Sequence, residues 1–185
     1  MYFRVNFAKL QFGDFTRYRK LNALLSPGTR RQKTKMNREV DYNIRGMTID
    51  DLPRIIELEH ELFSNPWPDY SFAVELNSSY SFNWVIESAE QVIGYAVIYI
   101  IEDECQIANF AIDSKYQKKG LGTELLKFIF TDAKQRGCAY CWLEVRQSNQ
   151  PAINLYKRFG FTVENIRRNY YSRPNEDALI MTRAF

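Results

Sequence analysis

The sequence is poor in the residues that metal centres and disulfide frameworks require. Its 185 residues include one histidine, His60, and three cysteines. Cys138 and Cys141 are spaced as Cys-x-x-Cys, but a structural zinc ion takes four ligands and the chain offers only one further cysteine and His60. Cys141 also opens an apolar stretch, whereas a redox pair is expected at the start of a helix, so we interpret both as small core residues. We therefore expect no metal site and a reducing, cytoplasmic location.

The sequence also lacks a long hydrophobic run. No apolar stretch approaches the roughly 20 residues of a membrane-spanning helix. Hydrophobic residues make up 45% of the chain and aromatic residues 15%, which is typical of a packed globular protein. The length suits one domain that buries most of its apolar surface without disulfides. We therefore expect a soluble protein with no membrane partner.

The net charge of +3 is distributed unevenly along the chain. Residues 1–40 carry ten Lys/Arg and two Asp/Glu, a net charge of +8, which leaves residues 41–185 with fifteen and twenty, a net charge of −5. We interpret 1–40 as a basic N-terminal extension and 41–185 as the folded domain. The extension is open to four interpretations: a disordered appendage, a contact with RNA or the ribosome, an Arg-rich targeting leader, or a stretch upstream of a true start at Met36.

Strands and helices are predicted to alternate along the domain. A capping box at Thr48–Asp51 predicts a helix that ends near Phe63, where Pro66 and Pro68 prevent its continuation. Hydrophobic periodicity predicts strands at 41–47, 82–88, 91–101, 104–112 and 142–146, and further helices at 69–76, 123–135 and about 150–159. This alternation predicts an α/β layer fold with a mixed sheet.

A glycine-rich turn, Gly120-Leu121-Gly122, lies between a predicted strand and helix. Glycines let the backbone approach a ligand, and the free N–H groups and dipole of the following helix favour an anion such as pyrophosphate. Lys118 and Lys119 add positive charge. The spacing fits neither a dinucleotide fingerprint, which needs glycine at Leu125, nor a P-loop, because Thr123 follows directly. Taken alone, the turn is equally consistent with an ordinary tight turn.

A carboxylate lies in the middle of the predicted strand that ends at Arg146. Glu144 and Arg146 share one face of that strand. A glutamate in a strand that is otherwise apolar is a candidate general base, although a salt bridge to Arg146 or a solvent-facing edge would also explain it. On the next helix, Asn149 and Tyr156 are seven residues apart, on one face and about 10 Å from each other. A ligand along that face would meet both, whereas Tyr156 alone would be interpreted as a core aromatic.

Several motifs together resemble the GNAT family of acetyltransferases. Gln117–Gly122 resembles that family's Gln/Arg-x-x-Gly-x-Gly/Ala signature. Further matches are Trp142–Arg146, Ser148–Tyr156, Phe159–Phe161, Arg167–Tyr171 and Glu176–Met181. The resemblance covers about residues 41–185 and is narrowest with the bacterial members that acetylate the N-terminal alanine of a small-subunit ribosomal protein. The chain departs from them mildly, with Lys118-Lys119 in place of arginines and Ser114 where proline is common.

The resemblance implies the GNAT fold, a mixed, mostly antiparallel central sheet flanked by about four helices, with strands parted at the acetyl-CoA site. It implies Glu144 as general base and Tyr156 as general acid. The implied cosubstrate is acetyl-CoA. Its implied binding residues are the backbone of Phe110, Ala111 and Ile112 for the pantetheine arm, Gln117, Lys118, Lys119, Gly120, Leu121, Gly122 and Thr123 for the pyrophosphate, and Asn149.

The implied chemistry suits these residue types. An α-amine has a pKa of about 7.7–8.0 against about 10.4 for lysine, so freeing its lone pair at neutral pH costs roughly 3–4 kcal/mol less. Glu144 would accept the proton directly or through water. Because no cysteine or serine is paired with a histidine base, we expect direct transfer in a ternary complex.

Candidate acceptor-binding residues are Trp67 and Tyr70, on the loop and helix after Phe63, and the pair Tyr170 and Tyr171. Simple packing of the loop would also explain Trp67 and Tyr70. The acidic residues near this loop, Glu59, Glu61 and Glu75, would either attract a basic peptide or form a solvated helix face.

Two other functions fit the same sequence. One is a protein N-terminal or lysine acetyltransferase of broader specificity, because substrate choice lies in loops. The other is a non-catalytic acyl-CoA-binding protein that contacts the ribosome or RNA through residues 1–40.

Overall fold

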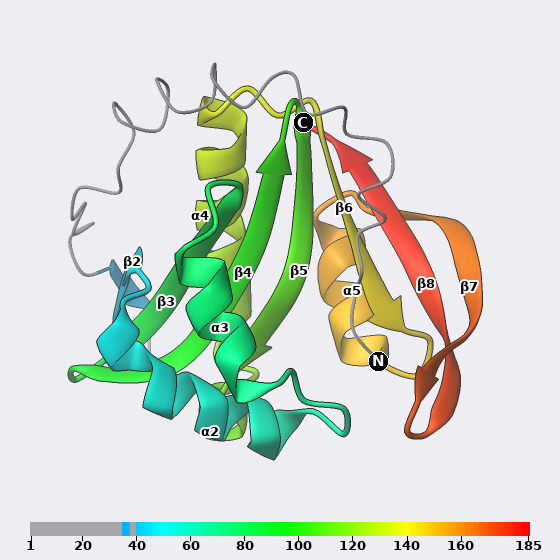
Figure 1. Cartoon of the computed structure of the whole chain (residues 1–185). Coiled ribbons are helices and arrows are strands. Elements are labelled where there is room, and N and C mark those ends of the chain that lie inside the picture. The colour runs from blue at the N-terminus through cyan, green and yellow to red at the C-terminus, as the bar shows by residue number, and fades with distance from the viewer. Residues whose placement is uncertain (1–34, 38–39) are drawn as a thin grey trace.

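The computed structural model describes residues 35–37 and 40–185. Most of the basic extension, with the interpretations given for it, lies outside these residues. Within them the chain forms an eight-stranded sheet in the order β1-β2-β3-β4-β5-β6-β8-β7 (Figure 1). β5 and β6 are parallel, and the other neighbouring pairs are antiparallel. The prediction of a mixed, mostly antiparallel sheet is therefore confirmed.

The observed elements lie close to the predicted ones. The strands are β1 (Lys35–Asn37), β2 (Val40–Gly46), β3 (Ser81–Ser88), β4 (Gln91–Ile101), β5 (Glu104–Ile112), β6 (Tyr140–Arg146), β7 (Thr162–Ser172) and β8 (Asn175–Ala184). The α-helices are α2 (Leu52–Leu62), α3 (Asp69–Leu76), α4 (Leu121–Gln135) and α5 (Gln150–Arg158). Periodicity did not predict β7 and β8. None of the helices in the described part of the chain has the length and apolar character of a membrane span.

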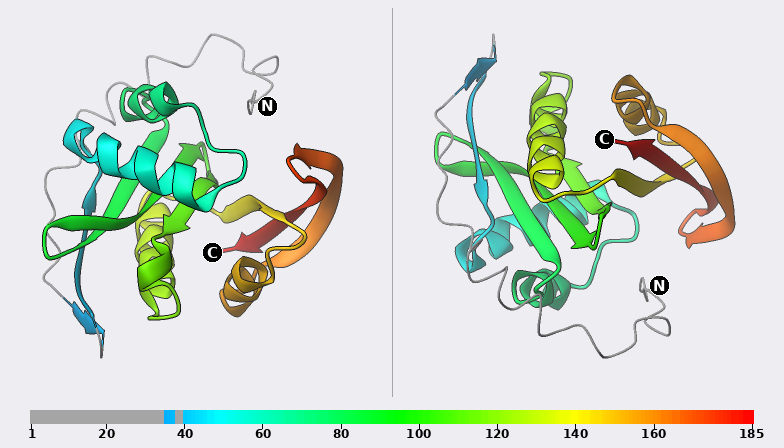
Figure 2. Two further views of the ribbon diagram at one scale, coloured as in Figure 1. Left: turned by 90° about the horizontal axis from the view of Figure 1, so that it is seen from below. Right: turned by 90° about the horizontal axis from the view of Figure 1, so that it is seen from above.

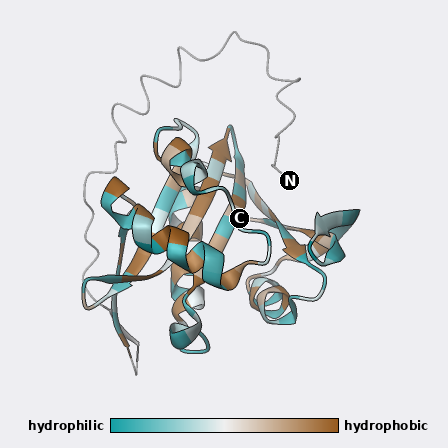
Figure 3. Cartoon of the chain, turned by 60° about the horizontal axis from the view of Figure 1, so that its bottom comes forward, coloured by the Kyte–Doolittle hydropathy of each residue, from teal (hydrophilic) through white to brown (hydrophobic). Residues whose placement is uncertain are grey.

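Helices cover both faces of the sheet. Figure 2 shows α2 and α3 on one face and α4 and α5 on the other. The inward sides of α2 and α3 carry the fully buried side chains of Ile55, Leu58 and Phe72. The inward side of α4 carries those of Leu125 and Ile129. Figure 3 shows apolar residues gathered on the central strands and on the inward sides of the helices. Burial of these side chains, at about 25 cal/mol per Å² of apolar surface, fixes the helices against the sheet.

The start of α2 is fixed by a local signal and by an ion pair. Thr48 and Asp51 form the predicted capping box. Arg45 on β2 donates to both carboxylate oxygens of Asp51 at 2.7 Å. This bidentate pair attaches the helix to the edge of the sheet.

The predicted parting of strands is present between β5 and β6. Their pairing runs from Glu104–Tyr140 to Ile107–Leu143 and then stops, and Figure 1 shows the two ribbons diverging below that point. Gly94 on β4 determines how closely the remainder of β5 packs, because a Cβ there would lie 2.6 Å from the carbonyl oxygen of Ala111. The sheet is therefore closed at one end of β5 and open at the other.

Candidate active site

The open edge of β5 is the first component of the site. Phe110, Ala111 and Ile112 pair with β4 on one side, but in the described chain β6 no longer pairs with them on the other. Apart from the Ile112 carbonyl, which accepts a hydrogen bond from Gln117, the backbone groups on that side are available to an extended ligand, which would add to the sheet as a strand does. The structure brings these three predicted residues to the opening.

The glycine turn leads from this edge into α4. Gly120 is the N-cap in the left-handed region, with φ 79°, and no side chain caps the helix. The first intrahelical bond runs from the N–H of Glu124 to the Gly120 carbonyl at 3.1 Å. The earlier N–H groups of Leu121, Gly122 and Thr123 therefore stand ahead of the helical ladder, which is the arrangement that binds phosphates. The helix begins two residues earlier than predicted because Gly120 adopts this positive φ.

The side chains of the turn have separate tasks. Gln117 donates to the Ile112 carbonyl at 2.9 Å, which attaches the turn to β5. Lys118 is exposed and has a φ of 60°, and the Lys119 ammonium lies 5.3 Å from the centroid of the Tyr116 ring. The Leu121 side chain is 1% exposed, so this residue presents its backbone to the turn. The two lysines supply positive charge beside the helix start.

Glu144 lies one residue beyond the last β5–β6 pair. Its side chain is 4% exposed. Tyr170 donates to Oε2 at 2.8 Å, and Arg167 forms an ion pair with Oε1, which accepts no well-aligned hydrogen bond. Burial raises the pKa of Glu144 above its ordinary value, although Tyr170 and Arg167 oppose this rise. One carboxylate oxygen thus accepts a hydrogen bond from Tyr170, and the other is held in the ion pair with Arg167.

The alternative of a salt bridge between Glu144 and Arg146 is wrong. The Arg146 guanidinium instead pairs with Glu176 at 3.2 Å and donates to Ser64 Oγ at 3.1 Å. It also stacks 4.0 Å from the centre of the Tyr171 ring. The two residues share a strand face, but the β7–β8 hairpin, which the periodicity did not predict, supplies different partners to each.

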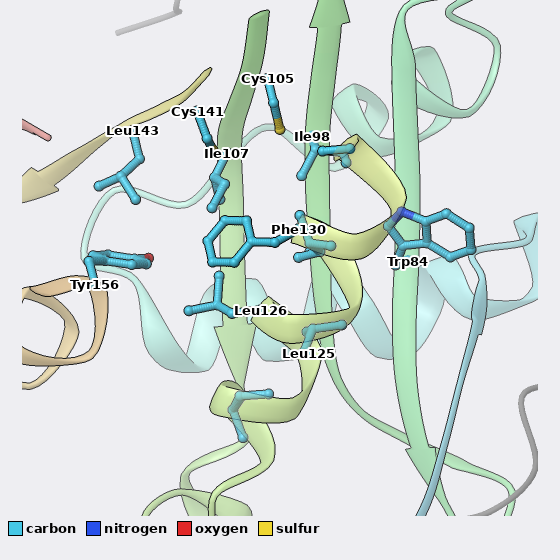
Figure 4. Packing of buried hydrophobic residues seen from close by; sticks show 14 of the residues in the cluster. Trp84, Ile98, Cys105, Ile107, Leu125, Leu126, Phe130, Cys141, Leu143 and Tyr156 are labelled. Atoms are coloured by element: carbon cyan, nitrogen blue, oxygen red, sulfur yellow. The ribbon is translucent and has the colours of Figure 1, made fainter. Parts of the chain in front are cut away.

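Tyr156 approaches the opening from the other face of the sheet. Tyr156 lies on α5, is 7% exposed and belongs to the same buried core as Leu143. Its ring centroid lies 5.7 Å from that of Phe161. Figure 4 shows its hydroxyl directed away from α5 and toward β5, which carries Ile107. Burial raises the pKa of Tyr156 above its ordinary value. Glu144 projects from the opposite face of β6, so the two predicted catalytic groups lie on opposite sides of the sheet where it opens.

Asn149 is the N-cap of α5. Its Oδ1 accepts a hydrogen bond from the N–H of Ala152 at 3.2 Å, which satisfies one of the free donors at the start of the helix. The side chain is exposed. The predicted contact of Asn149 with a cofactor stays a prediction.

Two loops come together beside Glu144. Ser64, in the loop between α2 and α3, donates to the Arg173 carbonyl at 2.6 Å, and Asn65 donates to Ser172 Oγ at 3.2 Å. These bonds join the loop to the turn of the β7–β8 hairpin. The structure thereby brings together the loop that holds Trp67 and the strand that holds Tyr170 and Tyr171, whose ring centroids are 5.0 Å apart. Tyr70, on α3, is 59% exposed.

A second buried carboxylate, Glu59 on α2, was missed. It is 1% exposed, so the prediction of a solvated or peptide-attracting acid is wrong there. The Trp67 N–H donates to Oε1 at 2.8 Å, and Tyr95 and Asn109 donate to Oε2. Burial raises its pKa despite these bonds. Its spacing four residues after Ile55, on the apolar face of the helix, was the signal that could have found it.

The contrast between Glu59 and Glu144 favours Glu144 as the candidate base. Both oxygens of Glu59 accept hydrogen bonds from within the fold. Glu144 lies where β5 and β6 part, and its Oε1 is held by the half-exposed Arg167. Glu59 therefore holds structure, whereas Glu144 as a general base stays a prediction.

The three cysteines are free thiols in the core, as predicted. Cys138 is 5% exposed and Cys141 fully buried. Within the described residues, no group of three His, Cys, Asp or Glu side chains is arranged to hold a metal ion.

Comparisons with known proteins agree with this architecture. Residues 52–161 match the model of the acetyltransferase (GNAT) family. A protein of Bacillus subtilis (strain 168) is 40% identical over 139 residues, which cover 75% of this chain and 92% of that protein. The [ribosomal protein bS18]-alanine N-acetyltransferase of Escherichia coli (strain K12) is 36% identical over 140 residues, which cover 75% of this chain and 94% of that enzyme.

Solved structures show the same similarity. The crystal structure of the ribosomal-protein-S18-alanine N-acetyltransferase from Escherichia coli superposes with a TM-score of 0.73 at 34% identity, covering 77% of this chain and 93% of that one. Ard1 from Thermoplasma volcanium shares the fold, with a TM-score of 0.72 at 23% identity. The family model spans more than half of this chain, and the two relatives described above match 75% of it. The chain therefore belongs to the GNAT family of acetyltransferases.

Proposed function

We propose that this protein transfers the acetyl group of acetyl-CoA to the N-terminal α-amine, an alanine, of a small-subunit ribosomal protein of the bS18 type. The observation that carries the proposal is a buried carboxylate, Glu144, that lies where β5 and β6 part and is held by Arg167 and Tyr170. The identity of 36% over nearly the whole length of an enzyme with that activity supports the choice of acceptor.

The residues at the opening fit acetyl-CoA. The free edge of Phe110–Ile112 matches the amide groups of an extended pantetheine arm, and the uncapped start of α4 after Gly120 matches a pyrophosphate. Lys118 and Lys119 would neutralise part of its charge. When bound, the cosubstrate supplies a thioester carbonyl that is activated toward attack by an amine.

Glu144 acts as the general base in this proposal. It takes the proton that the amine loses as its nitrogen bonds to the acetyl carbon and the bond from that carbon to sulfur breaks. Burial raises the pKa of Glu144 toward that of the amine, which improves the match between base and acid at neutral pH. The proton reaches the carboxylate directly or through water, while Arg167 at Oε1 and Tyr170 at Oε2 hold the group in place.

Tyr156 serves the leaving sulfur from the opposite face of the sheet. Because burial raises its pKa, the phenol stays protonated at neutral pH and is able to donate. It donates to the sulfur as that atom leaves, or orients it by the same hydrogen bond. The proposal includes direct transfer in a ternary complex, because among residues 35–37 and 40–185 no cysteine or serine nucleophile is paired with a histidine.

The acceptor peptide enters between the two joined loops. Tyr170 and Tyr171 from β7 supply aromatic surface beside Glu144, and Trp67, which packs against Phe72, lies on the loop that is bonded to their hairpin. The preference for an α-amine over a lysine side chain follows from the lower pKa of the α-amine, because deprotonating it at neutral pH costs less free energy. We place the reaction in the cytoplasm, where new ribosomal proteins meet the enzyme, and residues 1–40 are proposed to contact the ribosome electrostatically.

A peptide panel tests the proposal. Peptides with free N-terminal Ala, Ser or Met, an N-terminally blocked peptide that contains lysine, and a bS18 N-terminal peptide are incubated with acetyl-CoA, and the acetylated position is mapped by fragment mass spectrometry. The expected result is α-amine acetylation that is fastest with the bS18 peptide. Comparable rates across the panel would support broad specificity, and lysine modification would support the side-chain alternative. Binding of acetyl-CoA without thiol release on any peptide would support the non-catalytic alternative.

A further inference from the structure

A bulge in β7 places two side chains on Glu144 that a regular strand would separate. Residues three apart on a strand point to opposite faces, yet Arg167 and Tyr170 both contact this carboxylate. The register explains how. Arg167 pairs with Ala178 and Tyr171 with Glu176, so three residues of β7 lie opposite one of β8.

The bulge is held in a conformation that the backbone disfavours. Asn169 has a φ of 52°. Asp177, the single opposing residue, accepts the Asn169 N–H at 2.9 Å and the Arg168 guanidinium at 2.7 Å. Asn175 donates to the Asn169 side chain at 3.0 Å. Conformations of this kind persist where neighbours over-determine them, and they cluster at functional sites.

The bulge determines which charged group contacts Glu144. The charged and titratable groups on this face are Arg167, Tyr170 and Tyr171 from β7 and Arg146 from β6, while the β8 partner of Glu144 is the apolar Ile180. Arg146 is engaged with Glu176, and Arg167 is the cation in contact with the carboxylate. A buried carboxylate without a counter-charge would be neutralised by protonation and lost as a base.

We propose that Arg167 is a positioning residue for acetyl transfer: the β7 bulge delivers its guanidinium to Glu144, where it balances the buried carboxylate and keeps it ready to accept the acceptor's proton. The side chain of Arg167 is 48% exposed, so its guanidinium reaches the buried carboxylate from the solvent-facing rim of the site. A cation in this place also disfavours an ammonium ion beside it, which helps the acceptor to release its proton. This inference rests on the proposed function.

The test is the pH dependence of kcat/KM, which reports the groups of the free enzyme. Arg167→Met and Arg167→Lys are compared with wild type on an acceptor peptide with N-terminal alanine, between pH 5 and 9. Arg158→Met is the matched control, because it removes the same charge from an exposed arginine on α5 whose guanidinium donates to the Asn154 carbonyl of its own helix. The amine of the free peptide adds a limb common to all variants.

In Arg167→Met we expect the acidic limb of the kcat/KM profile to move up by about one pH unit or more, the usual effect of losing an opposite charge in contact. At pH values above the moved limb, activity should largely recover. Arg167→Lys should keep the limb within a few tenths of a unit of wild type, and so should Arg158→Met. An unmoved limb in Arg167→Met, or an equal move in Arg158→Met, would overturn the inference. If wild type acetylates none of the peptides, the proposed function fails, whereas activity with an unmoved limb removes only the role of Arg167.

Discussion

Replacing Glu144 with glutamine should separate catalysis from stability. The change keeps the shape of the side chain, and the remaining carbonyl oxygen still accepts the bond from Tyr170. It removes the ability to take a proton at neutral pH. General bases contribute about 10²- to 10⁴-fold to rate, so kcat should fall by that factor, or roughly 3–5 kcal/mol of barrier.

The effect on stability should be small or of the opposite sign. Burial raises the pKa of Glu144, so the group favours the folded state most when it is protonated, below its unfolded pKa, and this contribution is lost as pH rises through the folded pKa. Glutamine resembles the protonated form at every pH and avoids that loss at pH 7. The released Arg167 is 48% exposed and stays hydrated, so the lost ion pair costs at most about 1 kcal/mol.

The assay combines three measurements on one preparation. Thiol release gives kcat and KM, calorimetric titration gives acetyl-CoA affinity, and urea denaturation gives the free energy of unfolding. Glu164→Gln is the matched control, because Glu164 is an exposed glutamate on β7, and it should behave as wild type. Activity in Glu144→Gln within threefold of wild type would refute the role of base. Loss of stability by more than about 2 kcal/mol would refute the reasoning about burial.

Three further predictions concern the sheet, the phenol and the ion pair at α2. Tyr156→Phe should lower kcat about tenfold with little change in either KM, since one hydrogen bond to a charged group contributes roughly 1.5 kcal/mol, and unchanged thiol-release kinetics would contradict its role. Gly94→Ala should lower the free energy of unfolding by at least about 1–3 kcal/mol in urea, because the new Cβ would lie 2.6 Å from the backbone oxygen of Ala111. Burial would raise the pKa of Asp51, but hydrogen bonds led by Arg45 lower it below 3.8, so its stabilisation holds above that pH and is lost as pH falls through the lowered value. Asp51→Asn should therefore be less stable at pH 7, with a gap that narrows toward pH 3; a gap independent of pH would argue against the ion pair.

Local signals in the sequence determined the elements that surround the site. The Thr48–Asp51 box, the Gly120 turn and the apolar periodicity of α4 act within a few residues of the chain, and the structure shows each close to its predicted place. The motif resemblance added the mostly antiparallel character of the sheet and the parting of its strands, which periodicity alone does not give. Glu144 was predicted as a candidate base because a charged residue in an otherwise apolar strand is an exception, and the sequence of that strand alone reveals it.

Only the tertiary structure decided which groups meet. The partner of Glu144 is Arg167 and not its strand neighbour Arg146, because the register of β7 on β8 is set by Asp177, eight residues after Asn169 in the chain. Glu59 is buried for a similar reason, since its three donors come from β4, β5 and the loop after α2. Backbone propensity depends on near neighbours, whereas a buried charge is stable only where distant elements bring it partners, and the sequence by itself does not specify where those elements will lie.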